Sequence, residues 1–436
     1  MTNTACSMIT TTETPRAWRM NSLLRLAAML SLLVGMGVAA ESVVLSGATI
    51  HPVSSAPIEN GMVLIRNGKI EAVGQNLEIP EDAERIELEG MHLYPGFIHP
   101  LTAIGLTEIA SVRGTVDVAE MGNINAALRA EVAVDPDSMV MPVSIAGGIL
   151  SAHIAPGGGL IRGSSAIISL DGWTWEQMTL AAPVGMHIAF PSGAVDDNDN
   201  EDLKRIERAL DQARHWHQAR RAAEDGRAPV PAENDQLDAL GPVLDGSLPV
   251  FLHAQNERVM RAALDWAAEQ ELSRIVLVGG ADLQYLAERL ADDNTPVILT
   301  GVYSLPTRRW EPYDMAFVAP AKLHEAGVRF AIADSGGSMN VTNARNLPFQ
   351  AGSAAAFGLP PEAALSSVTL APAQILGIDD RLGSIEPGKQ ATLFAANGDP
   401  LEPMTRIKRV WIDGAEYDLD RDRQRQLYQR YLERLE

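Results

Sequence analysis

Cysteine is almost absent from this sequence: among 436 residues there is one, Cys6. The chain can therefore form no internal disulfide, and no cysteine beyond Cys6 can serve as a nucleophile or metal ligand. Aromatic residues make up only 5%, and positive charge is scarce, with 35 Lys and Arg against 56 Asp and Glu and a formal net charge of -21. A field this acidic repels a phosphate backbone, which argues against nucleic acid as a partner.

Long hydrophobic runs are also scarce, and the notable one lies at residues 26–40. Three arginines precede this run and two alanines end it, which is the pattern of a signal peptide over residues 1–40, with Met20 as a second candidate start. The run is too short to cross a bilayer. We expect an exported, periplasmic protein with no membrane span after cleavage; an uncleaved anchor is the alternative.

The two ends of the remaining chain share one sequence pattern. Short alternating strands are separated by the two-residue turns Asn67-Gly68 and Asp413-Gly414. Neither end holds enough apolar surface to form a core alone. Residues 41–94 and 384–418 are therefore predicted to pair into one composite β-sandwich, followed by a C-terminal helix at 419–436.

The middle of the chain, residues 95–383, alternates differently. Apolar runs rich in β-branched residues precede amphipathic helical stretches, and repeated strand-then-helix units indicate a parallel sheet. Eight such strands over roughly 290 residues are typical of a (β/α)8 barrel, with a doubly wound sheet as the alternative. The expected strands are 149–154, 165–170, 184–190, 249–253, 274–278, 296–300, 328–333 and one ending at Ile98.

Three motifs resemble the frame of the amidohydrolase superfamily, in its imidazolonepropionase-like branch. They are residues 61–74, Tyr94-Pro95-Gly96-Phe97-Ile98, and residues 382–389. The resemblance implies a β-sandwich around a metal-dependent barrel that hydrolyses C–N bonds of amides, ureas or cyclic amides. It also implies a small-molecule substrate, and leaves a homo-oligomer open.

The resemblance further implies a degenerate metal centre. The family's first barrel strand ends in Asp-x-His-x-His, whereas this chain has His99 at the aspartate position and Leu101 and Ala103 at the two ligand positions. Gly279 and Gly280 stand where another histidine ligand belongs. His99 is expected to be a buried, hydrogen-bonded histidine, with metal ligation as the alternative.

Three possible ligands remain. By the same resemblance, His187 replaces a metal-bridging lysine, His253 matches a histidine ligand, and Asp334 matches the aspartate that binds metal and accepts the proton from water. Such a set suits one divalent ion, zinc by preference, with water in the fourth position. The alternative is that no metal binds and these side chains are hydrogen-bonded relics.

Two functions follow. The first is a hydrolase of non-peptide C–N bonds in which Asp334 and His253 are catalytic and Arg162, after a glycine-rich loop, holds a substrate carboxylate. The second is a non-catalytic relative that serves as an exported binding or assembly module.

Overall fold

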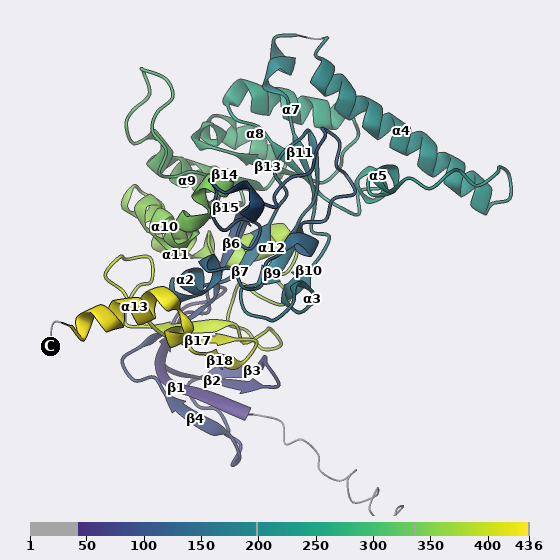
Figure 1. Cartoon of the computed structure of the whole chain (residues 1–436). Coiled ribbons are helices and arrows are strands. Elements are labelled where there is room, and N and C mark those ends of the chain that lie inside the picture. Colours follow the sequence, from purple (N-terminus) through teal and green to yellow (C-terminus); the bar gives the residue numbers. More distant parts are fainter. Residues whose placement is uncertain (1–41, 198, 335–336, 435–436) are drawn as a thin grey trace, which may run out of the picture. The chain divides into compact units, whose positions relative to one another are not determined.

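The computed structural model describes residues 42–197, 199–334 and 337–434, which form an α/β fold (Figure 1). The signal peptide predicted at residues 1–40 lies outside these described residues. Within the described ranges, no helix is both long enough and apolar enough to cross a membrane.

Both ends of the described chain contribute to one sheet of eight strands. Strand β16 from the C-terminal part runs antiparallel to β5 from the N-terminal part, with Phe394 opposite Tyr94. The end segments are thus joined in one sheet, while its arrangement as a two-layered sandwich stays a prediction. The strand order is β18 (Ala415–Tyr417), β17 (Ile407–Ile412), β16 (Leu393–Ala396), β5 (His92–Pro95), β1 (Ser42–Ile50), β2 (Ile58–Arg66) and β3 (Lys69–Gly74), with β4 (Glu84–Glu87) beside β1.

The two predicted hairpin turns are confirmed, and they touch each other. Gly68 and Gly414 have φ of 76° and 81°, in the left-handed region that favours glycine. A Cβ on Gly414 would lie 2.7 Å from the Cα of Gly68, so no side chain fits between the turns. Glycine is therefore required twice, for conformation and for close approach.

The strands of the middle segment form two further sheets. Strands β11 to β15 are parallel to one another, as the alternation of strands and helices predicts. The first sheet has the order β15 (Phe330–Ala333), β14 (Val297–Thr300), β13 (Ile275–Gly279), β12 (Val250–His253), β11 (Met186–Ala189) and β8 (Ile161–Ser164). The second has the order β10 (Thr179–Ala181), β9 (Ala166–Ser169), β7 (Ile149–Ile154) and β6 (Phe97–Thr102).

The strand expected at residues 165–170 differs from the prediction in direction. It begins earlier, as β8 and β9, and runs antiparallel both to β11 and to β7. The cause is the turn after β7, where Gly158 and Gly159 have φ of 83° and 74° and reverse the chain without an intervening helix. The prediction of a purely parallel sheet was therefore wrong at this strand.

Alternating side chains divide the strands into two faces. Phe251, Val276, Ile298 and Ala331 pack together on one face with helix α12 (Leu370–Leu376), while the intervening residues pack outward against the helices. β15 and β6 contact each other without pairing as strands in the described chain. Backbone carbonyls of the 367–368 segment accept hydrogen bonds from Ile332 N–H (3.1 Å) and Ile98 N–H (2.9 Å).

Helices surround these sheets (Figure 1). The longest, α4, begins at the cap residue Asn200, whose side chain accepts hydrogen bonds from two backbone N–H groups of the first turn. The α-helices are α2 (Val140–Ala146), α3 (Trp175–Met178), α4 (Glu201–Glu224), α5 (Asp235–Asp238), α6 (Gly241–Leu244), α7 (Glu257–Glu269), α8 (Ala287–Asp292), α9 (Met315–Glu325), α10 (Leu347–Ala356), α11 (Pro361–Ser366), α12 (Leu370–Leu376) and α13 (Arg423–Leu432). Short 3-10 segments are Arg113–Thr115, Ala130–Ala133, Ser192–Val195, Ala281–Leu286, Ser338–Asn346 and Leu419–Arg421.

Candidate functional site

A cavity of about 820 Å³ lies at the carboxyl ends of the strands. Its lining includes the last residue of β12, His253, and the last residue of β14, Thr300, together with residues that follow β7, β11 and β13. In α/β folds this end of the strands is where ligands bind, because loops from several strands converge there. We call it the strand-end cavity.

His253 is joined to His187 behind the cavity wall. Parallel pairing of β11 and β12 brings the two rings together, and His187 Nδ1 lies 2.9 Å from His253 Nε2, a hydrogen bond between imidazoles. Burial, and then the charge of Arg162, lower the pKa of His253 well below its usual value of 6.5. Burial, and then His253, lower the pKa of His187 in the same direction. Both rings are therefore neutral near pH 7.

Phe251 and His153 complete a cluster of four rings with these histidines. The Phe251 ring stacks on His187 with centroids 4.8 Å apart and an interplanar angle of 2°. His153 donates from Nδ1 to the Pro100 carbonyl at 2.7 Å, and its Nε2 lies 2.7 Å from the Ser165 hydroxyl. With both nitrogens occupied and no exposed surface, His153 is a structural residue that fixes the back of the ring cluster.

Gly185→Ala tests how tightly this cluster is packed. A Cβ at residue 185 would lie 2.2 Å from Cε2 of Phe251 and 3.0 Å from the Pro249 carbonyl oxygen. Because the ring would have to leave its stack on His187, we expect the free energy of unfolding in urea to fall by about 1–3 kcal/mol. Gly114→Ala, where a Cβ meets nothing within 4 Å, is the matched control and should change it by less than about 0.5 kcal/mol. Equal stability of the two variants would contradict the packing described.

Asp334 follows β15 and lies against His99. Both side chains are buried, and His99 Nε2 is 3.5 Å from Asp334 Oδ2, too long for a hydrogen bond but close enough for electrostatic attraction. The Leu101 N–H donates to His99 Nδ1 at 3.4 Å, so the ring proton sits on Nε2 and faces the carboxylate. The sequence prediction of a buried histidine is confirmed, but its pairing with Asp334 was missed, because two residues 235 positions apart carry no common local pattern.

The predicted three-ligand metal centre can be compared with these positions. Two of the expected ligands, His187 and His253, are in contact, whereas the contact found for Asp334 is with His99. In the described part of the chain, no three His, Cys, Asp or Glu side chains are grouped so that they could hold one metal ion. As arranged, the residues offer two nitrogens and not the three protein ligands of a zinc site, so they do not fit the metal centre that the resemblance implies.

The four positions that the sequence resemblance assigns to the other metal ligands do reach the cavity. Leu101, Ala103, Gly279 and Gly280 all line it. A Cβ on Gly279 would lie 2.3 Å from the Met260 side chain, so a histidine cannot be restored there without repacking. At these four positions the cavity wall is therefore made of apolar or small residues.

Arg162 lines the strand-end cavity. The other described residues that line it include no Asp, Glu, Lys or further Arg. It sits at an irregularity between β8 and β11, where Gly163 pairs with His187 and Ile161 pairs with Ile188, leaving Arg162 as the extra residue. Such a bulge re-aims a side chain, here toward the cavity. Desolvation lowers the pKa of its guanidinium.

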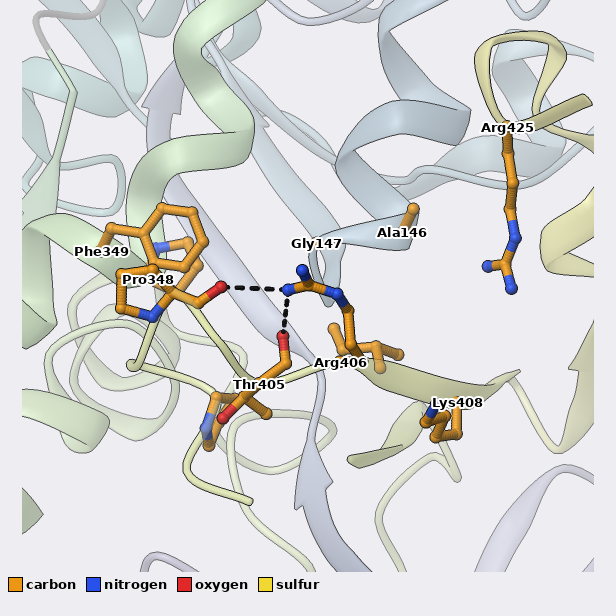
Figure 2. Close-up of a pocket in the computed structure, with 11 residues that line it drawn as sticks. Ala146, Gly147, Pro348, Phe349, Thr405, Arg406, Lys408 and Arg425 are labelled. Atoms are coloured by element: carbon orange, nitrogen blue, oxygen red, sulfur yellow. Dashed lines mark hydrogen bonds between the residues drawn. The ribbon is translucent and has the colours of Figure 1, made fainter. Parts of the chain in front are cut away.

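A second cavity, of about 470 Å³, lies elsewhere and lacks every residue predicted for the site (Figure 2). It is bordered by Arg406, Lys408 and Arg425. Arg406 donates to the carbonyls of Pro403 (3.0 Å) and Thr405 (3.2 Å), and Arg425 pairs with Asp420 at 3.1 Å. Arg406 and Arg425 already have partners within the chain, and none of the residues predicted for the site lines this cavity, so we do not assign the active site here.

The chain belongs to the amidohydrolase family, whose sequence model matches residues 160–416. Among curated proteins it is similar to the amidohydrolase tasK of Hapsidospora irregularis, with 27% identity over 398 residues that cover 82% of this chain and 40% of the relative. The chain therefore spans about two fifths of the length of that relative.

Solved structures agree with the fold. An amidohydrolase from Thermotoga maritima MSB8 superimposes with a TM-score of 0.79 and 26% identity, covering 86% of this chain and 99% of that one. Phenylurea hydrolase B gives a TM-score of 0.52 with 15% identity over 87% and 97% of the two chains. A zinc-bound adenosine deaminase from Xanthomonas campestris gives 0.50 with 17% identity over 89% and 98%. The latter two support the fold alone.

Proposed function

We propose that this amidohydrolase-family chain closes its middle strands into a (β/α)8 barrel and hydrolyses a non-peptide C–N bond, in an amide or cyclic amide, within the strand-end cavity. The observation that carries the proposal is the position of His253: it is a neutral imidazole at a strand end, lining a cavity of substrate size and braced by His187.

The proposed chemistry uses the two ring nitrogens of His253 differently. Its Nε2–H donates to His187 Nδ1, which leaves Nδ1 as a proton acceptor that has no other hydrogen bond in the described residues. His253 takes a proton from water as the water oxygen bonds to the carbonyl carbon. It then gives that proton to the nitrogen as the C–N bond breaks, and the products are a carboxylic acid and an amine. His187 acts as a positioning residue.

Asp334 has a different role in this proposal from the one that the resemblance implies. It is not among the described residues that line the cavity, and its carboxylate lies 3.5 Å from His99 Nε2. We assign it to holding His99 rather than to accepting a proton from water. No step is routed through a metal ion, because the arranged residues supply only two nitrogens in contact.

A panel assay tests the hydrolase directly. We would incubate the whole protein with N-acyl amino acids, ureas, lactams and hydantoins, and measure amine release by mass spectrometry. Turnover that survives extensive dialysis against a chelator supports the proposal. No turnover of any panel member would overturn it.

A non-catalytic binding or assembly module is the second candidate. It is favoured by Leu101, Ala103, Gly279 and Gly280, which replace the family's ligands on the cavity wall. In this case a ligand would bind in the cavity without turnover.

Metal content is a second measurement for this site. With two nitrogens available in place of three protein ligands, affinity should be too low to survive purification, and we expect fewer than about 0.1 equivalents of zinc, iron or manganese per chain by elemental analysis. One equivalent of metal, lost in His253→Ala, would mean that Asp334 moves to join the two histidines and would restore the metal-dependent hydrolase.

We also propose export to the periplasm, on the strength of the sequence at residues 1–40. Mass spectrometry of the native, fractionated protein should find a mature chain beginning near Glu41. A cytoplasmic chain that retains Met1 would refute export.

A further inference from the structure

Arg162 has no hydrogen-bond or ion-pair partner among the residues that the structure describes. Its Nε is buried without a hydrogen-bond partner, and the described residues supply neither a carboxylate nor a carbonyl within hydrogen-bond distance of its guanidinium. Many other arginines of the described chain are paired with a carboxylate, for example Arg258 with Asp196 at 2.7 Å. A cation that is partly withdrawn from water is destabilising unless an anion compensates for it.

The surroundings of Arg162 are built to keep it unpaired and directed at the cavity. Arg162 is the extra residue of the bulge between β8 and β11. The next residue, Gly163, has φ of 116°, and a Cβ added to it would lie only 2.6 Å from the Leu128 carbonyl oxygen. The guanidinium is also near enough to His253 and His187 to act on both electrostatically. The cation and the proposed general base therefore share one cavity.

We propose that the substrates are anionic: acids that carry a free carboxylate a few bonds from the amide, bound with the carboxylate on Arg162 and the amide carbonyl beside His253. This inference rests on the proposed function, and it adds the class of substrate. A single planar guanidinium matches a carboxylate through two parallel N–H bonds. Among the other described lining residues, Leu101, Val118 and Phe190 are apolar and Ser192, Gln255 and Thr300 are polar but uncharged. No lysine among them would serve a doubly charged phosphate.

The test compares acids with matched neutral amides. Binding of N-acetyl-L-amino acids and of the corresponding N-acetyl-L-amino-acid amides to the full-length protein is measured by calorimetry. We expect the acids to bind about 10- to 100-fold more tightly, and Arg162→Met to remove that preference. Arg162→Lys should retain only part of the preference for acids, since an ammonium group cannot donate two parallel N–H bonds to one carboxylate. Arg258→Gln, which removes a surface arginine that is already paired, is the control and should leave the preference intact.

Stability supplies a readout that needs no ligand. Because Arg162→Met removes an unpaired, partly buried charge, the Tm of the ligand-free protein should rise, whereas N-acetyl acids should raise the Tm of the wild type only. Equal binding of acids and amides, no binding of either, or tighter binding of a phosphate monoester would each overturn the inference. If the acids bind through Arg162 but are not hydrolysed, the substrate-binding inference stands and the proposed hydrolase fails.

Discussion

His253→Gln should lower kcat/KM for any hydrolysed substrate by about 100- to 10,000-fold, which is the usual contribution of a positioned general base. In the wild type, His187 Nδ1 lies 2.9 Å from His253 Nε2. Glutamine can keep a hydrogen bond to His187 Nδ1, but its side chain cannot take a proton from water. Kinetics on the best member of the substrate panel, with circular dichroism to verify folding, provide the measurement.

The same site predicts the pH dependence of activity. Because burial and Arg162 lower the pKa of His253, its neutral, proton-accepting form persists below pH 6.5, and kcat/KM should fall only at more acidic pH. His324→Gln, a change on the exposed side of α9, is the control and should leave both the rate and the profile unchanged. Activity that survives His253→Gln would assign the chemistry to other residues.

The second large effect is on stability in acid. Burial lowers the pKa of His153 from 6.5 to about 4, and it lowers those of His187 and His253 well below 6.5. Between pH 6.5 and 4 the unfolded chain therefore binds protons that the folded chain does not. The stability that these neutral histidines contribute is fully present above pH 6.5 and is lost as the pH falls. His153 alone corresponds to a loss of about 3 kcal/mol by pH 4.

Urea unfolding between pH 7.5 and 4.5 measures this loss. His153→Gln should be less stable at neutral pH, because it disturbs two short hydrogen bonds, yet its stability should fall less steeply with acid than that of the wild type. His215→Gln, on the exposed face of α4, should keep the wild-type slope. A slope unchanged by His153→Gln would show that the acid sensitivity arises elsewhere.

Much of the architecture could be predicted because it depends on local patterns. The turns at Asn67-Gly68 and Asp413-Gly414 follow from residues that tolerate positive φ, and strands β11 to β15 follow from short apolar runs before helices. The reversal at β8 and β9 was missed, since strand direction depends on how the preceding loop turns and not on the strand's own residues.

The candidate site, too, could be predicted only in part from local sequence. The sequence by itself determined that Leu101 and Ala103 cannot bind a metal, because this depends only on side-chain chemistry, and it singled out His187, His253 and Arg162 by position. Only the tertiary structure decided which of these side chains are in contact. Hydrogen-bond register between β11 and β12 brings His187 to His253, while Asp334 lies against His99 and Arg162 has no counter-ion among the described residues. Contacts between residues distant in sequence depend on strand register and bulges, which a single sequence does not encode locally.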